Sequence, residues 1–366
     1  MTDLNVAAPP AATVVAGFLD SSRNSEYHGA LTPTELDARP GEIEALISAS
    51  ALHDLGWLRR VAVRGKDRVR WLSGMVTNMV KDLPPRGGAW NLVLNAQGRI
   101  QGDLHVWRES DDLELEVTVD QAHKLLAHLN HFIIMDDVEL ALVEGQSAIG
   151  LAGPMAGDVL ARLALPALPE PMTQTRGEWK GIPLLLRRPF GVLTDHYAIW
   201  IPTPRAGHLW QALTDAGAKP VGSAALEAFR IAEGIPAYGV DIVDRDLPQE
   251  TSQLRALHFN KGCYLGQEIV ERIRSRGNVH RHLLSLELDG PLPEPGAKLT
   301  LDDADAGHVT SAAELPLPRG ARRFAIGMIR AEAQTRNLPF HYSVGETAGL
   351  AHILALSPNL TPDMER

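Results

Sequence analysis

The most informative stretch of this 366-residue chain surrounds its single cysteine: Lys261-Gly262-Cys263-Tyr264-Leu265-Gly266-Gln267-Glu268. A lone cysteine cannot close an internal disulfide, and it cannot by itself hold a metal tetrahedrally. An apolar-periodic run begins after Gly266, so we expect Cys263 to lie near a helix N-terminus and a lysine. Both lower the pKa of a thiol. The sequence therefore predicts a reactive thiol at Cys263, and a buried structural cysteine is the alternative.

Composition indicates an ordinary globular protein, because 45% of the residues are hydrophobic and 22% are charged. A chain of this length is expected to form two or three domains. The net charge of −10 opposes binding to nucleic acid and to anionic membranes. The single cysteine, a start at residues 1–10 that lacks signal-peptide features, and polar interruptions within 149–168 predict a cytoplasmic protein without a membrane span.

Outside the cysteine motif, hydrophobic periodicity predicts short helices and strands in mixed order. Expected helices cover residues 33–51, 66–79, 121–132, 154–163 and 207–216, and expected strands cover 60–63, 90–94, 102–107, 113–119, 148–151, 184–187, 197–201, 281–288 and 323–330. The order lacks a regular βαβ rhythm, which favours antiparallel α+β domains over a doubly wound sheet. After the proline-rich segment 291–295, short strands between Gly and Pro turns predict a small all-β domain.

These elements suggest a division of the chain into four parts. We expect a flexible tail at 1–13, an N-terminal α+β domain at 14–145, a second α+β region with the cysteine motif at 146–279, and a β-barrel domain at 280–366. Segments of the two α+β regions can interleave.

Familiar signatures of phosphate, metal and serine-hydrolase chemistry are missing. Gly65-Lys66 lacks the other residues of a P-loop, and no G-x-G-x-x-G or G-x-S-x-G segment occurs in a suitable context. His123, His128 and His131 are better explained as a solvated helix face than as metal ligands, so no metal site is predicted. The segment 259–281 carries five basic residues against two acidic ones, which indicates an anion docking site or, alternatively, the solvent face of a helix.

The cysteine motif carries a family resemblance, together with the preceding segments 230–242 and 247–250. It resembles the signature of YgfZ-type folate-binding proteins, which belong to the superfamily of the glycine-cleavage T-protein, an aminomethyltransferase. Residues 74–80 and 94–100 are similar to the superfamily's Thr-Asn segment and hairpin turn, so the resemblance spans most of residues 50–330.

This resemblance implies a fold and a function. The fold class would be α+β, with two ferredoxin-like antiparallel α+β domains and a small C-terminal β-barrel in a ring around a central tetrahydrofolate cavity. The function would be assistance in assembling or repairing iron–sulfur clusters in client enzymes, including radical enzymes that modify tRNA. The implied protein is a monomer whose partners are folate and these clients. Its functional thiol would be Cys263 with Lys261 as electrostatic partner, and its folate-binding residues would be Asn95, Arg99, Asp103, Arg230, Tyr264, Gly266, Gln267 and Glu268.

Two departures from the T-protein pattern bear on the activity. T-proteins carry two adjacent aspartates after the hairpin turn, where this chain has Gly102-Asp103, and their pterin-recognising glutamate corresponds to Ala198. Losing that carboxylate leaves buried donors of the heterocycle unpaired, at about 1–3 kcal/mol per group. The sequence thus favours the maturation role over aminomethyl transfer or demethylation. A third alternative is a non-catalytic, folate-gated adaptor in which Cys263 is a packed core residue.

Overall fold

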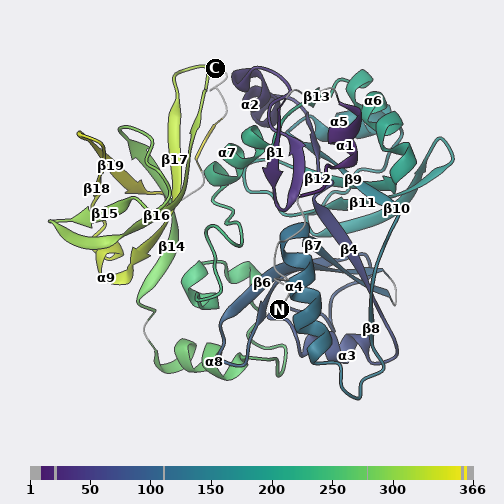
Figure 1. The fold of residues 1–366 in the computed structure, drawn as a ribbon, viewed down its shortest axis with the longest axis horizontal. Helices are drawn as coiled ribbons and strands as arrows, with labels where there is room; N and C mark the ends of the chain where they lie inside the picture. Colours follow the sequence, from purple (N-terminus) through teal and green to yellow (C-terminus); the bar gives the residue numbers. More distant parts are fainter. Residues whose placement is uncertain (1–9, 20–22, 110–111, 278, 356–357, 361–366) are drawn as a thin grey trace, which may run out of the picture.

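A computed structural model describes residues 10–19, 23–109, 112–277, 279–355 and 358–360. Two sheets with their helices lie together on one side of the molecule, and a β-barrel lies beside them (Figure 1). The first sheet has five antiparallel strands in the order β5-β6-β7-β4-β8. Its strands are β4 (Leu58–Arg64), β5 (Gly88–Leu94), β6 (Ile100–Glu109), β7 (Asp112–Thr118) and β8 (Glu139–Leu142).

Helix α4 (Val119–His131) and the short α3 (Arg68–Ser73) belong with this first sheet. In α4, Leu125 and Leu129 lie one turn apart and are buried in a core shared with β4, β6 and β7. Alternate residues of β6 are buried, as expected of a strand with one face against a core.

The second sheet has six strands in the order β10-β11-β12-β9-β3-β13. Its strands are β3 (Ala51–Asp54), β9 (Gln146–Ala152), β10 (Thr173–Trp179), β11 (Ile182–Arg188), β12 (His196–Pro202) and β13 (Lys219–Pro220). The β13–β3 pair is parallel and the other pairs are antiparallel. Because β3 precedes the first sheet in the chain, the two α+β regions exchange segments.

Helices surround the second sheet and connect it to the rest of the chain. They are α1 (Val14–Phe18), α2 (Arg39–Ser48), α5 (Ala156–Arg162), α6 (Ala206–Asp215) and α7 (Ser223–Glu233), and a hairpin of β1 (Asn24–Tyr27) and β2 (Ala30–Pro33) precedes α2. Helix α7 ends at Gly234, which has a φ of 67°, a left-handed conformation that glycine adopts without steric cost.

The closed barrel has the strand order β14-β17-β16-β15-β18-β19. Its strands are β14 (Arg281–Asp289), β15 (Lys298–Leu301), β16 (Ala304–Leu315), β17 (Arg322–Arg330), β18 (Phe340–Val344) and β19 (Thr347–Ile353), with the short α9 (Ala331–Gln334) after β17. Helix α7 packs on β16 and β17, and α8 (Gln267–Arg276) precedes the barrel at its lower end in the view of Figure 1.

The predicted fold class is confirmed: the protein is α+β, with several sheets and a closed six-stranded barrel near its C-terminus. Each predicted helix and strand overlaps an observed element of the same type. The sequence did not indicate β3, β8, β10, β15, β16, β18, β19 or α7. These elements are short or irregular in pattern, or depend on pairing with distant partners.

Two expectations need correction. The helix predicted at 66–79 ends at Ser73, because the chain beyond it is held by long-range polar contacts. Buried Thr77 donates to the carbonyl of Ala256 and accepts from the amide of Leu92. The predicted tail falls mostly on residues 1–9, which lie outside the described residues, but its last residue, Thr13, is buried and donates a hydrogen bond to Asp54.

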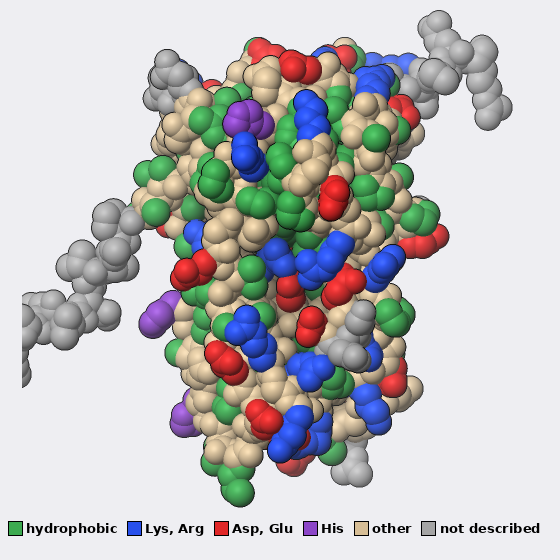
Figure 2. Space-filling model, turned by 90° about the vertical axis from the view of Figure 1, so that its right-hand side faces the viewer, with side chains coloured by type: hydrophobic (Ala, Val, Ile, Leu, Met, Phe, Trp, Pro, Cys, Tyr) green, Lys and Arg blue, Asp and Glu red, His purple; other side chains and the backbone are tan. Residues whose placement is uncertain are grey.

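Figure 2 shows a face of the molecule on which basic and acidic side chains alternate. Neither sign forms a continuous field there, consistent with a protein whose charges are largely paired on its surface. Among the described residues, no helix is both long enough and apolar enough to span a membrane.

Candidate functional site

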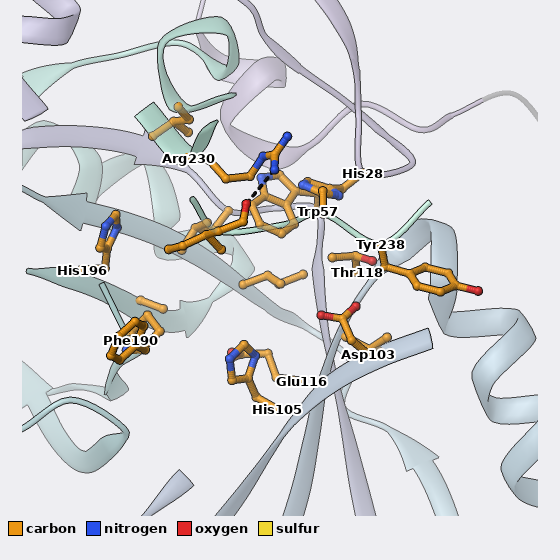
Figure 3. A pocket seen from close by; sticks show the side chains of 18 of the residues that line it. His28, Trp57, Asp103, His105, Glu116, Thr118, Phe190, His196, Arg230 and Tyr238 are labelled. Carbon is orange, nitrogen blue, oxygen red and sulfur yellow. Dashed lines mark hydrogen bonds between the residues drawn. The ribbon is translucent and has the colours of Figure 1, made fainter. Parts of the chain in front are cut away.

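A cavity of about 260 Å³ lies where the two sheets meet α7 and the loop that follows it. This volume is far above the roughly 15 Å³ that one water needs, so the cavity can hold an organic ligand. Figure 3 shows side chains entering it from both sheets and from α7. The polar and aromatic lining residues include Tyr27, His28, His53, Trp57, Asp103, His105, Glu116, Phe190, His196, Arg230, Glu233 and Tyr238.

Asp103 is the carboxylate that β6 contributes to the cavity wall. Its Oδ2 accepts from the indole Nε1 of Trp90, and its Oδ1 accepts from Nε2 of Gln121, each at 2.8 Å. The Gln121 side chain also accepts from the Asp103 backbone amide at 2.9 Å. Two donors from separate elements therefore hold the carboxylate of Asp103 in a fixed orientation.

His196 and Glu233 form a charged pair on the opposite wall. The His196 Nε2 lies 3.2 Å from Glu233 Oε2, and Glu233 Oε1 also accepts from the backbone amides of Val192 and Leu193. Burial opposes charge on His196, but the Glu233 carboxylate outweighs burial and raises the pKa of His196. The histidine and the carboxylate therefore stabilise each other's charged forms.

His53, on β3, differs from the other cavity histidines. Its side chain is 5% exposed, and neither Nδ1 nor Nε2 has a hydrogen-bond partner among the described residues. Burial lowers the pKa of His53 to about 3, so the imidazole is neutral at physiological pH. The indole Nε1 of Trp57, another lining residue, is likewise buried without a partner. Such orphaned polar atoms are uncommon in folded proteins, and beside a cavity they indicate groups that await a ligand.

A second cavity adjoins the first and shares with it Asp103, His105 and Phe190. Its wall includes Arg255, whose guanidinium lies 4.2 Å from the ring centre of Phe190 and 5.1 Å from that of Trp90. Burial lowers the pKa of Arg255 to about 10, which leaves it charged at neutral pH. A ligand that extends from the first cavity into the second would meet a cation held between two aromatic rings.

A buried ion-pair network joins the two sheets behind the first cavity. Arg187 on β11 is fully buried and donates to Glu116 at 2.8 Å and to Glu114 on β7. Glu114 also accepts from Arg60, through Nε at 2.9 Å. Burial opposes charge on both glutamates, but Arg60 and Arg187 lower the pKa of Glu114, and Arg187 lowers that of Glu116. The network fixes the spacing of the sheets and so the shape of the cavity between them.

The cysteine motif lies elsewhere. Cys263 is exposed and, among the described residues, is not one of those lining either cavity. Lys261 Nζ donates to the carbonyl of Ser73 at 2.7 Å and to that of Val76, and lies 5.1 Å from the ring centre of Tyr264. Burial lowers the pKa of Lys261 to about 7. The lysine thus anchors the motif to the end of α3, and the expected alternative of a buried structural cysteine is wrong.

The residues after Cys263 rest on the hairpin turn between β5 and β6. Gly266 has a φ of 80°, and a Cβ there would lie 2.6 Å from the carbonyl oxygen of Asn95. The Asn95 side chain accepts from the amides of Gln97 and Arg99, which closes the turn. In the same region, Arg99 donates to the carbonyl of Arg245, Gln267 accepts from the amide of Tyr264, and Glu268 is exposed.

The structure therefore divides the predicted site residues into two groups. Asp103 and Arg230 line the cavity, whereas Asn95, Arg99, Lys261, Cys263, Tyr264, Gly266, Gln267 and Glu268 form the cluster around the hairpin turn. Arg230 donates to Glu227 and Asp241, so its charge is already compensated within the protein. His53, Trp57, His196 and Glu233 were not anticipated, because they come from separate segments, and only Glu233 lies in the segment 230–242 that the sequence had singled out.

The fold and the cavity define a class: an α+β protein with an appended barrel and a cavity with polar and aromatic walls between its sheets. The model of the GCVT N-terminal domain matches residues 16–261, more than half of the chain, so the protein belongs to this family. The chain is 27% identical to an aminomethyltransferase of Geobacillus kaustophilus, over 85% of this chain and 87% of that protein. It is 24% identical to an aminomethyltransferase of Thermoanaerobacter pseudethanolicus, over 78% and 80%.

A solved structure supports the same fold. The glycine cleavage system aminomethyltransferase T from Bartonella henselae superposes with a TM-score of 0.82 at 20% sequence identity, covering 91% of this chain and 93% of that one. At this identity the likeness concerns the fold alone. The T-protein part of the expected relationship is thereby established, and the narrower YgfZ-type assignment stays a prediction.

Proposed function

We propose that the cavity between the sheets binds a reduced folate, tetrahydrofolate or a one-carbon derivative, and that the protein performs folate-dependent transfer chemistry of the T-protein type. One observation carries this proposal: His53 and Trp57, whose side-chain nitrogens are buried without a partner among the described residues, line the same cavity as the Asp103 carboxylate. A pterin is flat and has apolar faces and a polar edge. The cavity offers the matching surfaces, because Phe190 and Leu55 supply apolar wall next to these polar groups.

The bound folate would supply a ring amine that accepts or releases a one-carbon unit. The chain's own contribution is electrostatic. Asp103, held by Trp90 and Gln121, would stabilise positive charge that develops near it or accept a proton from a substrate amine. The apolar part of the wall lowers the local dielectric and so strengthens this interaction.

The departure at position 198 limits how closely the chain would follow T-protein chemistry. Ala198 is buried on β12 and lines the cavity, so the carboxylate of the T-protein pattern is missing from the wall. Folate would be held by a different set of contacts. Transfer activity and binding are therefore separate questions that need separate assays.

Isothermal titration with tetrahydrofolate tests binding, and formation of methylenetetrahydrofolate from an aminomethylated carrier protein tests transfer. Wild type should bind, and Asp103→Asn should lose turnover by about 10²–10⁴-fold while it still binds, because a positioned acid–base group contributes about that much. Lys66→Ala, at an exposed lysine outside the cavity, is the matched control and should bind normally. No measurable binding by wild type would refute the proposal. Binding without turnover would reject the transferase part.

A second candidate function rests on the exposed Cys263. We infer a tetrahydrofolate-dependent role in assembling or repairing iron–sulfur clusters in client enzymes, such as radical tRNA-modifying enzymes, with the Cys263 thiol acting at the protein surface. A single thiolate cannot hold a cluster alone, but an exposed one can share a cluster or sulfur ligand with a client. The packed Cys263 that the adaptor alternative assumed is wrong, since this side chain is exposed, and the folate-gated adaptor role itself stays a prediction.

The test is rescue of cluster-enzyme activity in cells that lack the protein. Cys263→Ala should fail to rescue, and Lys66→Ala, at an exposed lysine far along the chain, should rescue fully. Full rescue by Cys263→Ala would reject the thiol role. It would leave the folate-binding proposal untouched, because Cys263 is not among the residues that line the cavity.

A further inference from the structure

Three residues form a straight row across the cavity wall of the second sheet. His53 on β3 pairs with Gly150 on β9, and Gly150 pairs with Ala198 on β12. Residues at the same register of neighbouring strands share a face of the sheet. His53 and Ala198 both line the cavity. The row therefore runs from a large polar side chain, over a glycine, to a methyl group.

The glycine in the middle of the row makes room for the imidazole. A Cβ on Gly150 would lie 1.9 Å from Cε1, 2.3 Å from Nδ1 and 2.4 Å from Nε2 of His53. The ring thus lies directly over the Gly150 backbone, in the direction of Ala198. A substituent at position 150 would have to expel it.

The ring nitrogens of His53 have no hydrogen-bond partner among the described residues. Both nitrogens are buried, and the residue as a whole is only 5% exposed, so water cannot satisfy them. Leaving a buried polar group unpaired costs about 1–3 kcal/mol. A cavity wall that keeps such a group, and keeps a glycine beneath it, is built to present the imidazole to a ligand.

We propose that His53 is a specificity-determining residue of the cavity, and that one of its ring nitrogens hydrogen-bonds the polar edge of the bound heterocycle. The proposed role of His53 rests on the proposed folate-binding function, and it names a residue that recognises the ligand. A neutral imidazole offers one donor and one acceptor, whereas a carboxylate offers acceptors alone. With alanine at position 198 in the same row, the histidine supplies the polar contact on this part of the wall.

Titration of tetrahydrofolate into purified full-length variants tests the proposal. His53→Phe keeps a flat ring of similar size without polar atoms, and should weaken binding by about 5- to 100-fold, the range for loss of one hydrogen bond to a buried group. Gly150→Ala, which displaces the imidazole without removing it, should weaken binding in the same direction. His53→Gln, which retains a donor and an acceptor, should bind more tightly than His53→Phe. His352→Ala, at an exposed histidine of the barrel, is the matched control and should match wild type.

The outcomes distinguish the proposed role of His53 from the proposed folate binding on which it rests. If wild type binds tetrahydrofolate and His53→Phe binds equally well, the role of His53 is refuted and the folate site stands. If wild type does not bind, the folate site fails and the inference falls with it. Thermal melting of each variant shows whether it is folded. Should His53→Phe be unfolded, weaker binding by a folded His53→Gln or Gly150→Ala still supports the inference, and unchanged binding by both overturns it.

Discussion

Replacing Arg187 by methionine gives the sharpest test of how the cavity is built. The guanidinium is fully buried between the sheets, with Nη1 donating to Glu116 at 2.8 Å, Nη2 donating to Glu114, and Nε donating to Gln174 at 3.0 Å. Methionine fills much of the same volume but brings no charge. Glu114 keeps Arg60 as a partner, whereas Glu116 keeps hydrogen bonds from two neutral indoles.

The expected cost follows from Glu116. Breaking a buried ion pair by removing one partner costs about 3–5 kcal/mol. The carboxyl can avoid the uncompensated charge by binding a proton. At pH 7 that costs about 3 kcal/mol for an ordinary glutamate pKa of 4.5, at about 1.4 kcal/mol per pH unit. At pH 5 the same proton costs less than about 1 kcal/mol. The destabilisation should therefore be large at pH 7 and much smaller at pH 5.

In the wild type, by contrast, the stability that the Arg187–Glu116 pair contributes should decrease in acid. Arg187 lowers the pKa of Glu116 below 4.5 in the folded state, so the stability from this pair is present above pH 4.5 and is lost as the pH falls through the lowered value. Urea unfolding followed by tryptophan fluorescence reports on the region directly, because Trp107 and Trp200 contact the network. Arg330→Met removes an exposed ion pair in the barrel and serves as control.

A shift of the Arg187→Met midpoint that is equally large at pH 5 and pH 7 would refute the reasoning, because it would mean that loss of packing and not an uncompensated carboxylate sets the cost. An unchanged midpoint at pH 7 would mean that the network contributes nothing to joining the sheets.

Three further predictions concern the cavity wall and the cysteine motif. In the folded protein the pKa of His53 is about 3, against an ordinary 6.5, so folding stability should fall by up to about 5 kcal/mol as the pH drops from 6.5 to 3. His53→Phe should flatten the pH dependence of urea unfolding over this range. An unaltered slope would contradict burial of a neutral His53 as the cause. Lys261→Met should destabilise by about 1–3 kcal/mol, because two partly buried carbonyls lose their donor; Lys66→Met, at an exposed position, should not, and equal effects would show that the anchor does not exist. Gly266→Ala should destabilise by about 1–3 kcal/mol, because its φ of 80° disfavours alanine and its Cβ would lie 2.6 Å from the Asn95 carbonyl oxygen; a melting temperature equal to that of wild type would exclude the close approach.

Much of the fold could be predicted from local pattern. The alternation of β6 and β7, the helical spacing of Leu125 and Leu129 in α4, and the late change to short strands each depend on residues close in sequence. The helix predicted at 66–79 was too long, because its actual end depends on contacts with residues that are distant in sequence. Thr77 bonds to Ala256, 179 positions away, and no local pattern indicates such a contact.

The candidate site likewise has a part that depends on residues close in sequence and a part that depends on long-range contacts. The sequence by itself determined the α+β class, the barrel, the family, and the contiguous motif around Cys263, because each is written in neighbouring residues or in the spacing of apolar ones. Only the tertiary structure decided that Cys263 faces solvent and that His53, Gly150 and Ala198 form one wall of a cavity. Strand pairing brings together residues nearly 150 positions apart, and the burial that leaves the His53 imidazole neutral and unpartnered exists only once both sheets have closed around it.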